Sequence, residues 1–95
     1  MEEVLAVVER IPSGRAISYG AIADYLSDRS GRSSARLVGS IMAKHGGSVP
    51  WHRVVSANGR VVPGHEGEAL ARLIGEATPM KNGRVDLSRA AWRPE

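Results

Sequence analysis

Apolar residues recur at helical spacing through the first half of the chain. This periodicity predicts a helix over residues 2–10, which the segment "PSG" ends. Ser18 is a favoured N-cap for a second helix, and Ser33 or Ser34 can cap a third helix that runs to about Lys44. The apolar stripes of the three helices consist of Val4, Leu5, Val8 and Ile11, then Tyr19, Ile22, Ala23 and Leu26, then Leu37, Val38, Ile41 and Met42.

Short apolar segments and turn signals dominate the second half of the chain. Residues 53–55 and 60–62 flank "SANG", in which Asn58-Gly59 is typical of a tight hairpin turn. A further helix is expected over residues 66–75. The remaining expected features are an inward face of that helix made by Ala69, Leu70, Leu73 and Ile74, an extended piece at residues 84–87, and an apolar anchor at Trp92.

The order of these elements predicts the fold class. Three helices followed by a β-hairpin form the sequence of elements found in a winged helix-turn-helix, in which the third helix is the recognition element. The 95 residues contain no internal repeat and no linker long enough to divide them, so one domain over residues 1–95 is expected. The predicted fold is mainly α with a small β-hairpin, a winged helix-turn-helix-like DNA-binding domain.

The outer face of the third helix mixes small and basic residues. It carries Arg36, Gly39, Ser40, Ala43 and Lys44 opposite the apolar stripe. Gly39 lowers helix propensity, but small residues also allow a helix backbone to approach a ligand closely. Two interpretations are open from these residues alone: a loosely constrained surface, and a face that contacts a ligand.

The charge balance favours a polyanionic ligand. The 13 basic residues exceed the 10 acidic ones, which gives a formal net charge of +3 and a pI of about 10. Only Lys44 and Lys81 are lysines, and the planar guanidinium of arginine suits phosphate contacts, although codon bias can also produce an arginine-rich surface. Tyr19, at a helix N-terminus where phosphate is favoured, either contacts a nucleotide or is a half-buried core residue.

Several classes of site are poorly supported. The chain has no cysteine, which removes disulfides, thiolate metal ligands and a thiol nucleophile and fits a reducing cytoplasm. His45, His52 and His65 are not at metal-ligand spacing, and no serine-hydrolase or phosphate-loop pattern is present, so neither a metal nor a cofactor is expected. No apolar run reaches the length of about 20 residues that spans a membrane, and the acidic N-terminus is not that of a signal peptide.

Three motifs resemble one protein family in order and spacing. They are "IPSGRAISYGAIADYL", "SARLVGSIM" and "VPWHRVVSANGRV". They resemble the DNA-binding C-terminal domain of the O6-alkylguanine-DNA alkyltransferases, the methylated-DNA–protein-cysteine methyltransferase family. That family carries I-P-x-G-x-V-x-(S/T)-Y-(G/Q), then A-R-x-V-G, then P-C-H-R-V, and the resemblance runs over residues 11–74.

The main departure from the family lies at the alkyl acceptor. Trp51 stands where the family has its acceptor cysteine, and an indole nitrogen is not a usable nucleophile near neutral pH. P-W-H-R-V in a short chain is similar to the alkyltransferase-like proteins, the non-enzymatic branch, so the resemblance implies no catalytic residue and no enzyme activity. The best alignment also places Ala71 where the family has the glutamate that completes its proton relay.

The resemblance implies recognition of DNA damage. Alkyltransferase-like proteins bind duplex DNA with O6-alkylguanine through the minor groove, flip the damaged nucleotide into a pocket and pass the lesion to nucleotide excision repair. The expected partners are damaged duplex DNA and nucleotide excision repair proteins, and the expected state is a cytoplasmic monomer, nucleoid-associated in a bacterium. Two alternatives stay open: a family member with residual enzymatic activity, and a generic winged-helix regulator that binds a DNA sequence.

The resemblance also implies individual site residues. Arg36 matches the arginine finger that fills the gap left by the flipped base, and Tyr19 matches the tyrosine that pushes on the 3′ phosphate. The implied nucleotide pocket consists of Tyr19, Pro50, Trp51, His52, Arg53 and Val54. The implied DNA-binding set consists of Arg36, Ser34, Ala35, Gly39, Ser40 and Lys44.

Overall fold

The three helices predicted for the first half of the chain are present. The computed structural model describes residues 2–30 and 34–94. Ser18 and Ser34 each accept a hydrogen bond from the backbone N–H three residues later at 3.1 Å, which confirms them as N-caps, while Ser33 lies outside the described residues. The helices are α1 (Glu2–Glu9), α2 (Tyr19–Ser30) and α3 (Ala35–His45).

The second half consists of short elements around one longer helix. That helix has the predicted bounds, and the fold class of a mostly helical domain with a small β-hairpin is confirmed. The elements are β1 (Ile17–Ser18), η1 (Gly46–Ser48), η2 (Trp51–Arg53), β2 (Val54–Val55), α4 (Glu66–Gly75), β3 (Met80–Lys81), β4 (Arg84–Val85) and α5 (Leu87–Ala90).

The strand pairing at β2 differs from the predicted hairpin. Residues 60–62, the expected partner of residues 53–55, do not form a strand. β2 pairs in parallel with β1 instead, so that Val54 lies opposite Ile17. Both valines of β2 are fully buried, and a continuous apolar run is typical of a strand that is covered on both faces.

The turn at Asn58-Gly59 does form, but no strand follows it at residues 60–62, and Gly59 bonds to β4 instead. The carbonyl of Ser56 accepts from the Gly59 N–H at 2.9 Å, and the Gly59 carbonyl accepts from the N–H of Val85 at 2.9 Å. Gly59 has φ of +84°, and a Cβ at this position would clash with the Val85 carbonyl oxygen, so this close approach requires glycine. The antiparallel hairpin in the described part of the chain is β3–β4, with Met80 opposite Val85.

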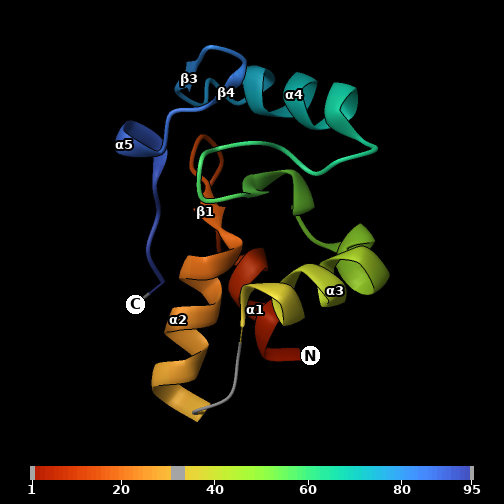
Figure 1. The fold of residues 1–95 in the computed structure, drawn as a ribbon. Coiled ribbons are helices and arrows are strands. Elements are labelled where there is room, and N and C mark those ends of the chain that lie inside the picture. Colours follow the sequence, from red (N-terminus) through yellow and green to blue (C-terminus); the bar gives the residue numbers. More distant parts are fainter. Residues whose placement is uncertain (1, 31–33, 95) are drawn as a thin grey trace.

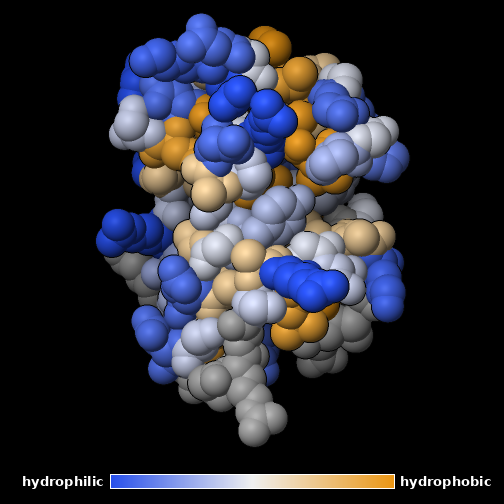
Figure 2. Space-filling model, viewed as in Figure 1, coloured by the Kyte–Doolittle hydropathy of each residue, from blue (hydrophilic) through white to orange (hydrophobic). Residues whose placement is uncertain are grey.

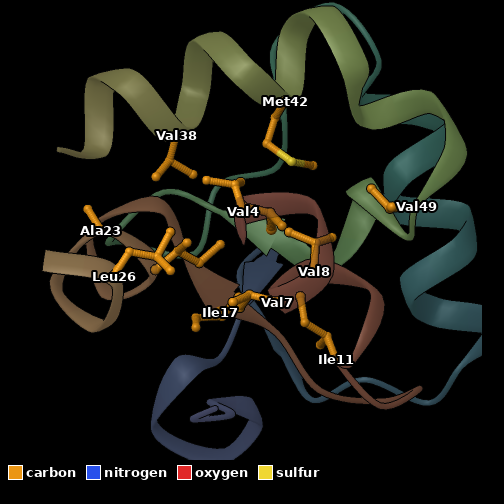
Figure 3. Close-up of a cluster of buried hydrophobic side chains, with 12 residues drawn as sticks. Val4, Val7, Val8, Ile11, Ile17, Ala23, Leu26, Val38, Met42 and Val49 are labelled. Carbon is orange, nitrogen blue, oxygen red and sulfur yellow. The ribbon is translucent and has the colours of Figure 1, made fainter. Parts of the chain in front are cut away.

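The core consists of two clusters of buried side chains. Figure 3 shows the first cluster, in which Val38 and Met42 of α3 point toward Val4 of α1. The second cluster joins β2, α4, β4 and α5. The first cluster contains Val4, Val7, Val8, Ile11, Ile17, Ile22, Ala23, Leu26, Val38, Met42, Val49 and Val54, and the second contains Ala16, Val55, Leu73, Val85 and Ala90.

Two apolar residues that were expected to face inward are exposed. Leu37 on α3 is 47% exposed and Ile74 on α4 is 64% exposed. Both helices bury a narrower stripe than predicted: α3 buries Val38 and Met42, with Ile41 partly buried against the core, and α4 buries Ala69 and Leu73. Figure 2 accordingly shows hydrophobic surface among hydrophilic side chains on this face, both at the level of α3 and around α4.

β1 lies between two other segments of extended chain. β2 pairs with one edge of β1, and on the other edge Ala16 forms a parallel bridge with Ala91. In Figure 1 α3 and α4 therefore lie on the right of the molecule, and α5 and the C-terminus lie on the left. The extended piece predicted at residues 84–87 is shorter, because Asp86 accepts from the Ser88 N–H at 3.2 Å and caps α5. Within the described residues, no helix is long and apolar enough to cross a membrane.

Candidate nucleic-acid interface

A cleft of about 690 Å³ brings several of the predicted site residues together. It lies between α3 and α4, which are one above the other on the right of Figure 1, and its wall includes the start of α2 and η2. Tyr19 and Trp51 of the predicted nucleotide pocket line it, and so does Gly39 of the predicted DNA-binding set. The lining residues that were not predicted are Met42, Ala43, Gly47, Val62, Pro63, His65, Glu68 and Arg72.

Trp51 is constrained from several sides by its neighbours. Its ring meets the rings of His52 and His65 edge to face, with centroids 6.1 Å and 5.8 Å apart. The guanidinium carbon of Arg72 lies 5.5 Å from the indole centroid, and Nη2 of Arg72 is 2.6 Å from Oε2 of Glu68. The half-buried indole is therefore a preorganised part of the cleft wall.

His52 and Arg53 converge on Glu76 behind Trp51. His52 Nε2 lies 2.8 Å from Glu76 Oε2. Arg53 donates from Nε to Oε1 at 3.0 Å and from Nη2 to Oε2 at 2.7 Å, a bidentate pair. Arg53 Nη1 also donates to the carbonyl of Ile11 at 2.8 Å. These contacts, named here the Glu76 clamp, join the end of α4 to η2 and to the chain that follows α1.

The charge of Glu76 is stabilised within the clamp. The hydrogen bonds from Arg53, with a smaller contribution from His52, lower the pKa of Glu76 from 4.5 to about 2, although desolvation acts in the opposite direction. Because the ionised carboxylate only accepts, the Nε2–H of His52 is the donor in their hydrogen bond. His52 is 5% exposed, and its Nδ1 has no hydrogen-bond partner within the described part of the chain.

Sequence alignment supplied no carboxylate partner for His52, because it placed Ala71 at the position of the family's glutamate. Ala71, the aligned position, is exposed on α4, whereas Glu76 follows the end of that helix and reaches the imidazole. Spacing along a helix cannot predict a contact made beyond its last turn, where the chain changes direction. One signal was available: a carboxylate near the negative end of a helix dipole is unfavourable unless a cation pairs with it.

The outer face of α3 has the small and basic character predicted for a ligand-binding helix. Arg36, Ser40 and Lys44 are exposed on it, and Gly39 lines the cleft. A Cβ added at Gly39 would meet nothing within 4 Å, so internal packing does not require glycine there. A glycine that costs helix propensity without a packing benefit favours the second interpretation of this face, close approach by a ligand.

Tyr19 supplies a neutral hydroxyl to the cleft. It is the first residue of α2 and is half-buried. Burial raises the pKa of the Tyr19 hydroxyl above its ordinary value of 10.0, so the group stays protonated near neutral pH and can donate a hydrogen bond. No group of three His, Cys, Asp or Glu that could hold a metal ion occurs among the described residues.

Comparison with known proteins identifies the family. Residues 1–78 match the family described as the 6-O-methylguanine DNA methyltransferase, DNA binding domain. The chain belongs to this family. The DNA base-flipping proteins of Escherichia coli (strain K12) and Shigella flexneri are each 29% identical to it, over 96% of this chain and 72% of theirs.

Two solved structures of relatives have the same fold. Schizosaccharomyces pombe (S. pombe) Atl1 in complex with damaged DNA containing O6-carboxymethylguanine superposes with a TM-score of 0.79 at 29% identity, covering 98% of this chain and 94% of that one. A second structure, of S. pombe ATL in complex with DNA, gives a TM-score of 0.76 at 30% identity with the same coverage. The similarity therefore spans nearly the whole of this family member.

Several residues of the predicted pocket support the cleft of this family member without lining it. Val54 is fully buried in the first core cluster, because β2 pairs with β1, and its assignment to the pocket wall is wrong. His52 and Arg53 lie behind Trp51 in the Glu76 clamp, and Pro50 precedes η2. Of the predicted DNA-binding set, Ser34 caps α3 and Ala35 is exposed in its first turn.

Proposed function

We propose that this protein binds duplex DNA containing O6-alkylguanine through the minor groove, receives the flipped nucleotide in the cleft and does not transfer the alkyl group. One observation carries the proposal: an indole, Trp51, forms the wall of the cleft at the position where the family motif has its cysteine. The relatives named for base flipping and the relative solved with damaged DNA containing O6-carboxymethylguanine support a ligand of this kind.

The chemistry of the cleft favours binding over reaction. Alkyl transfer to a protein needs a thiolate or another strong nucleophile, and none of the 95 residues is a cysteine. A planar indole can contact an apolar alkyl group or a base without forming a bond to it. The cleft volume of about 690 Å³ lies within the range of about 300–1,000 Å³ found for sites that enclose small ligands, so a single nucleotide is a suitable occupant.

Helix α3 supplies the contacts expected of the duplex-binding face. Flipping a nucleotide costs a few kcal/mol of unstacking, and less for a base that pairs badly. Arg36, exposed in the first turn of α3, is the side chain we assign to the space that the flipped base leaves. Lys44 on the same helix adds salt-dependent attraction to phosphates.

The later steps follow from a lesion that is bound and not repaired. A protein that marks O6-alkylguanine must pass it to other proteins, and we assign this step to nucleotide excision repair. A monomer that acts in the cytoplasm, on the nucleoid in a bacterium, fits this role. The clamp residues His52 and Glu76 then position the cleft wall and carry out no proton transfer to a substrate.

The test is a binding titration on paired duplexes that differ by one O6-methylguanine. We expect tighter binding to the damaged duplex, and Arg36→Ala is expected to weaken that binding by at least about 1 kcal/mol, or about fivefold in Kd. Arg89→Ala, which removes an exposed arginine from α5, is the matched control and should change the Kd by less than about twofold. Equal affinity for the two duplexes would identify a regulator that reads a DNA sequence instead.

A second measurement tests the absence of enzymatic activity. The protein is incubated with a duplex that carries radiolabelled O6-methylguanine, and the label on the protein is then counted after denaturation. We expect the label to remain on the DNA. A stable, stoichiometric label on the protein would show that it is an alkyltransferase.

A further inference from the structure

A second cavity lies on another part of the surface and is lined by arginines. It has a volume of about 590 Å³, and its lining residues are Arg10, Arg15, Ala91, Trp92 and Arg93, which we name the arginine–tryptophan surface. It combines the chain after α1 with the C-terminal segment that follows α5. None of these residues belongs to the cleft described above.

Backbone and side-chain hydrogen bonds hold this surface in place. The N–H of Trp92 donates to the Ala16 carbonyl at 2.8 Å, and the N–H of Ala16 donates to the Ala90 carbonyl at 3.0 Å. Arg15 donates from Nε to the Ala90 carbonyl at 3.0 Å and from Nη2 to the carbonyl of Ala91. The half-buried Trp92 also packs against the first core cluster, so its position is fixed by the fold.

Three arginine side chains line this surface. The acceptors of Arg15 are neutral carbonyls, which orient its guanidinium and leave its charge in place. The guanidinium carbon of Arg10 lies 6.0 Å from the Trp92 ring centroid, and Arg93 is exposed beside them. Among the described residues that line this cavity, none is acidic. Three guanidinium groups around one concave site attract an anionic partner.

The position of the surface separates it from the nucleotide cleft. β2, which follows Trp51, pairs with one edge of β1, and the segment that contains Ala91 bridges to the other edge. In Figure 1 the C-terminal segment lies on the left, and the helices that form the cleft lie on the right. A duplex seated on α3 therefore leaves the arginine–tryptophan surface accessible to a second partner.

We infer that this surface docks an acidic segment of a partner protein while damaged DNA occupies the cleft. The inference extends the proposed function, because it names the chemistry of the partner to which the lesion is passed. Arginine and tryptophan are the side chains most often responsible for binding energy in protein interfaces. A concave site with an indole suits a peptide that bears carboxylates and an apolar side chain, whereas a phosphate backbone offers charge without an apolar group for Trp92.

The chain offers one reporter for each site, since its two tryptophans are Trp51 in the cleft and Trp92 on this surface. A proton–nitrogen correlation spectrum of the labelled protein shows one indole N–H signal for each, and the spectrum of Trp51→Phe assigns them. The probe is a short glutamate-rich peptide with one central phenylalanine. We expect the peptide to shift the Trp92 signal saturably, both in the free protein and in its complex with the O6-methylguanine duplex.

Matched variants locate the peptide on the protein. Arg93→Ser should raise the peptide Kd by about threefold. The control, Arg60→Ser, removes an exposed arginine that follows the Asn58-Gly59 turn, and it should change the Kd by less than about twofold. Arg93 is exposed, so its loss should not unfold the protein. Equal effects of the two variants would mean that the peptide responds only to net charge, and would overturn the inference.

Three further outcomes would also overturn it: a Trp92 signal that the peptide leaves unmoved, a peptide that shifts the Trp51 signal alone, and a damaged duplex that displaces the peptide. The last result would identify the surface as part of the DNA contact. The titration of damaged against undamaged duplex is made on the same sample. Failure of the proposed function therefore shows as a missing lesion preference, and failure of this inference shows as a missing shift at Trp92.

Discussion

The Glu76 clamp predicts how the stability of the fold depends on pH. The pKa of Glu76 is about 2 in the folded protein against an ordinary 4.5, because Arg53 and His52 bind the ionised form. A lowered folded-state pKa contributes stability that is fully present above 4.5 and is lost as the pH falls toward 2. At about 1.4 kcal/mol per unit of pKa, the difference corresponds to an upper limit of about 3 kcal/mol. The side chain is 17% exposed, so solvent reduces this figure, and we expect about 1–3 kcal/mol.

The assay compares Glu76→Gln with the unmodified protein in urea unfolding followed by circular dichroism, at about pH 7 and about pH 3. We expect the variant to be less stable by about 1–3 kcal/mol at the higher pH, and less than half of that difference to remain at the lower pH. The difference between the two proteins isolates Glu76, because the other carboxylates titrate in both.

Glu68→Gln is the matched control for the Glu76 experiment. Glu68 forms an ion pair with Arg72 one turn away on α4, and both side chains are about half exposed, at 53% and 49%. Exposed pairs at this spacing contribute about 0.3–0.5 kcal/mol, so the control should lose little stability at either pH. The stabilising role of the clamp would be refuted if Glu76→Gln lost the same unfolding free energy at both pH values, or lost no more than the control.

Two further predictions concern glycine at a turn and an exposed leucine. Gly59→Ala should destabilise the protein by at least about 2 kcal/mol in urea unfolding, because a Cβ would clash with the Val85 carbonyl as well as require a positive φ. Gly64→Ala is the control, since Gly64 has φ of +90° but open space around its Cβ position. An equal loss of stability in the two variants would contradict the clash at Gly59. If α3 contacts the duplex, Leu37→Ala removes roughly 50 Å² of apolar contact and should weaken binding to the O6-methylguanine duplex by about 1 kcal/mol, about fivefold in Kd. Ile74→Ala, more exposed but on α4, should leave that Kd within about twofold, and equal effects would count against contact by α3.

The helices could be predicted from sequence because their signals are local. Ser18 and Ser34 are N-caps whose hydrogen bonds span three residues, and the stripes that follow them depend only on helical spacing. The third helix was expected to bury Leu37 as well, but the width of a buried stripe depends on what packs against the helix. That information is not local, and the structure leaves Leu37 half exposed.

The strand pairing and the carboxylate of the clamp could not be predicted in the same way. The turn at Gly59 was correct, but the segment pairs with residues distant in the sequence: β2 pairs with β1, and the Gly59 carbonyl accepts from the N–H of Val85. A local turn signal carries no information on such partners. Glu76 was missed for a related reason, since its contact with His52 joins residues 24 positions apart and depends on where α4 ends. Trp51 and Tyr19 line the cleft, and these two residues were identified by a motif and not by a spacing rule.

The Glu76 clamp also explains how a pocket of this kind keeps its shape without a reactive thiol. Arg53 and Glu76 join the end of α4 to η2, and Arg53 also holds the carbonyl of Ile11, so the elements around the cleft are fixed by contacts that do not involve the side chain of residue 51. The residue at this position can therefore differ in chemistry while the backbone that presents it stays in place. Beside a thiol, a histidine bonded to a carboxylate can serve proton transfer. In this chain His52 is oriented by the same bond, and its ring meets that of Trp51 edge to face, with the two centroids 6.1 Å apart. An arrangement suited to proton transfer thus positions an aromatic wall, which is what the proposed recognition without reaction requires.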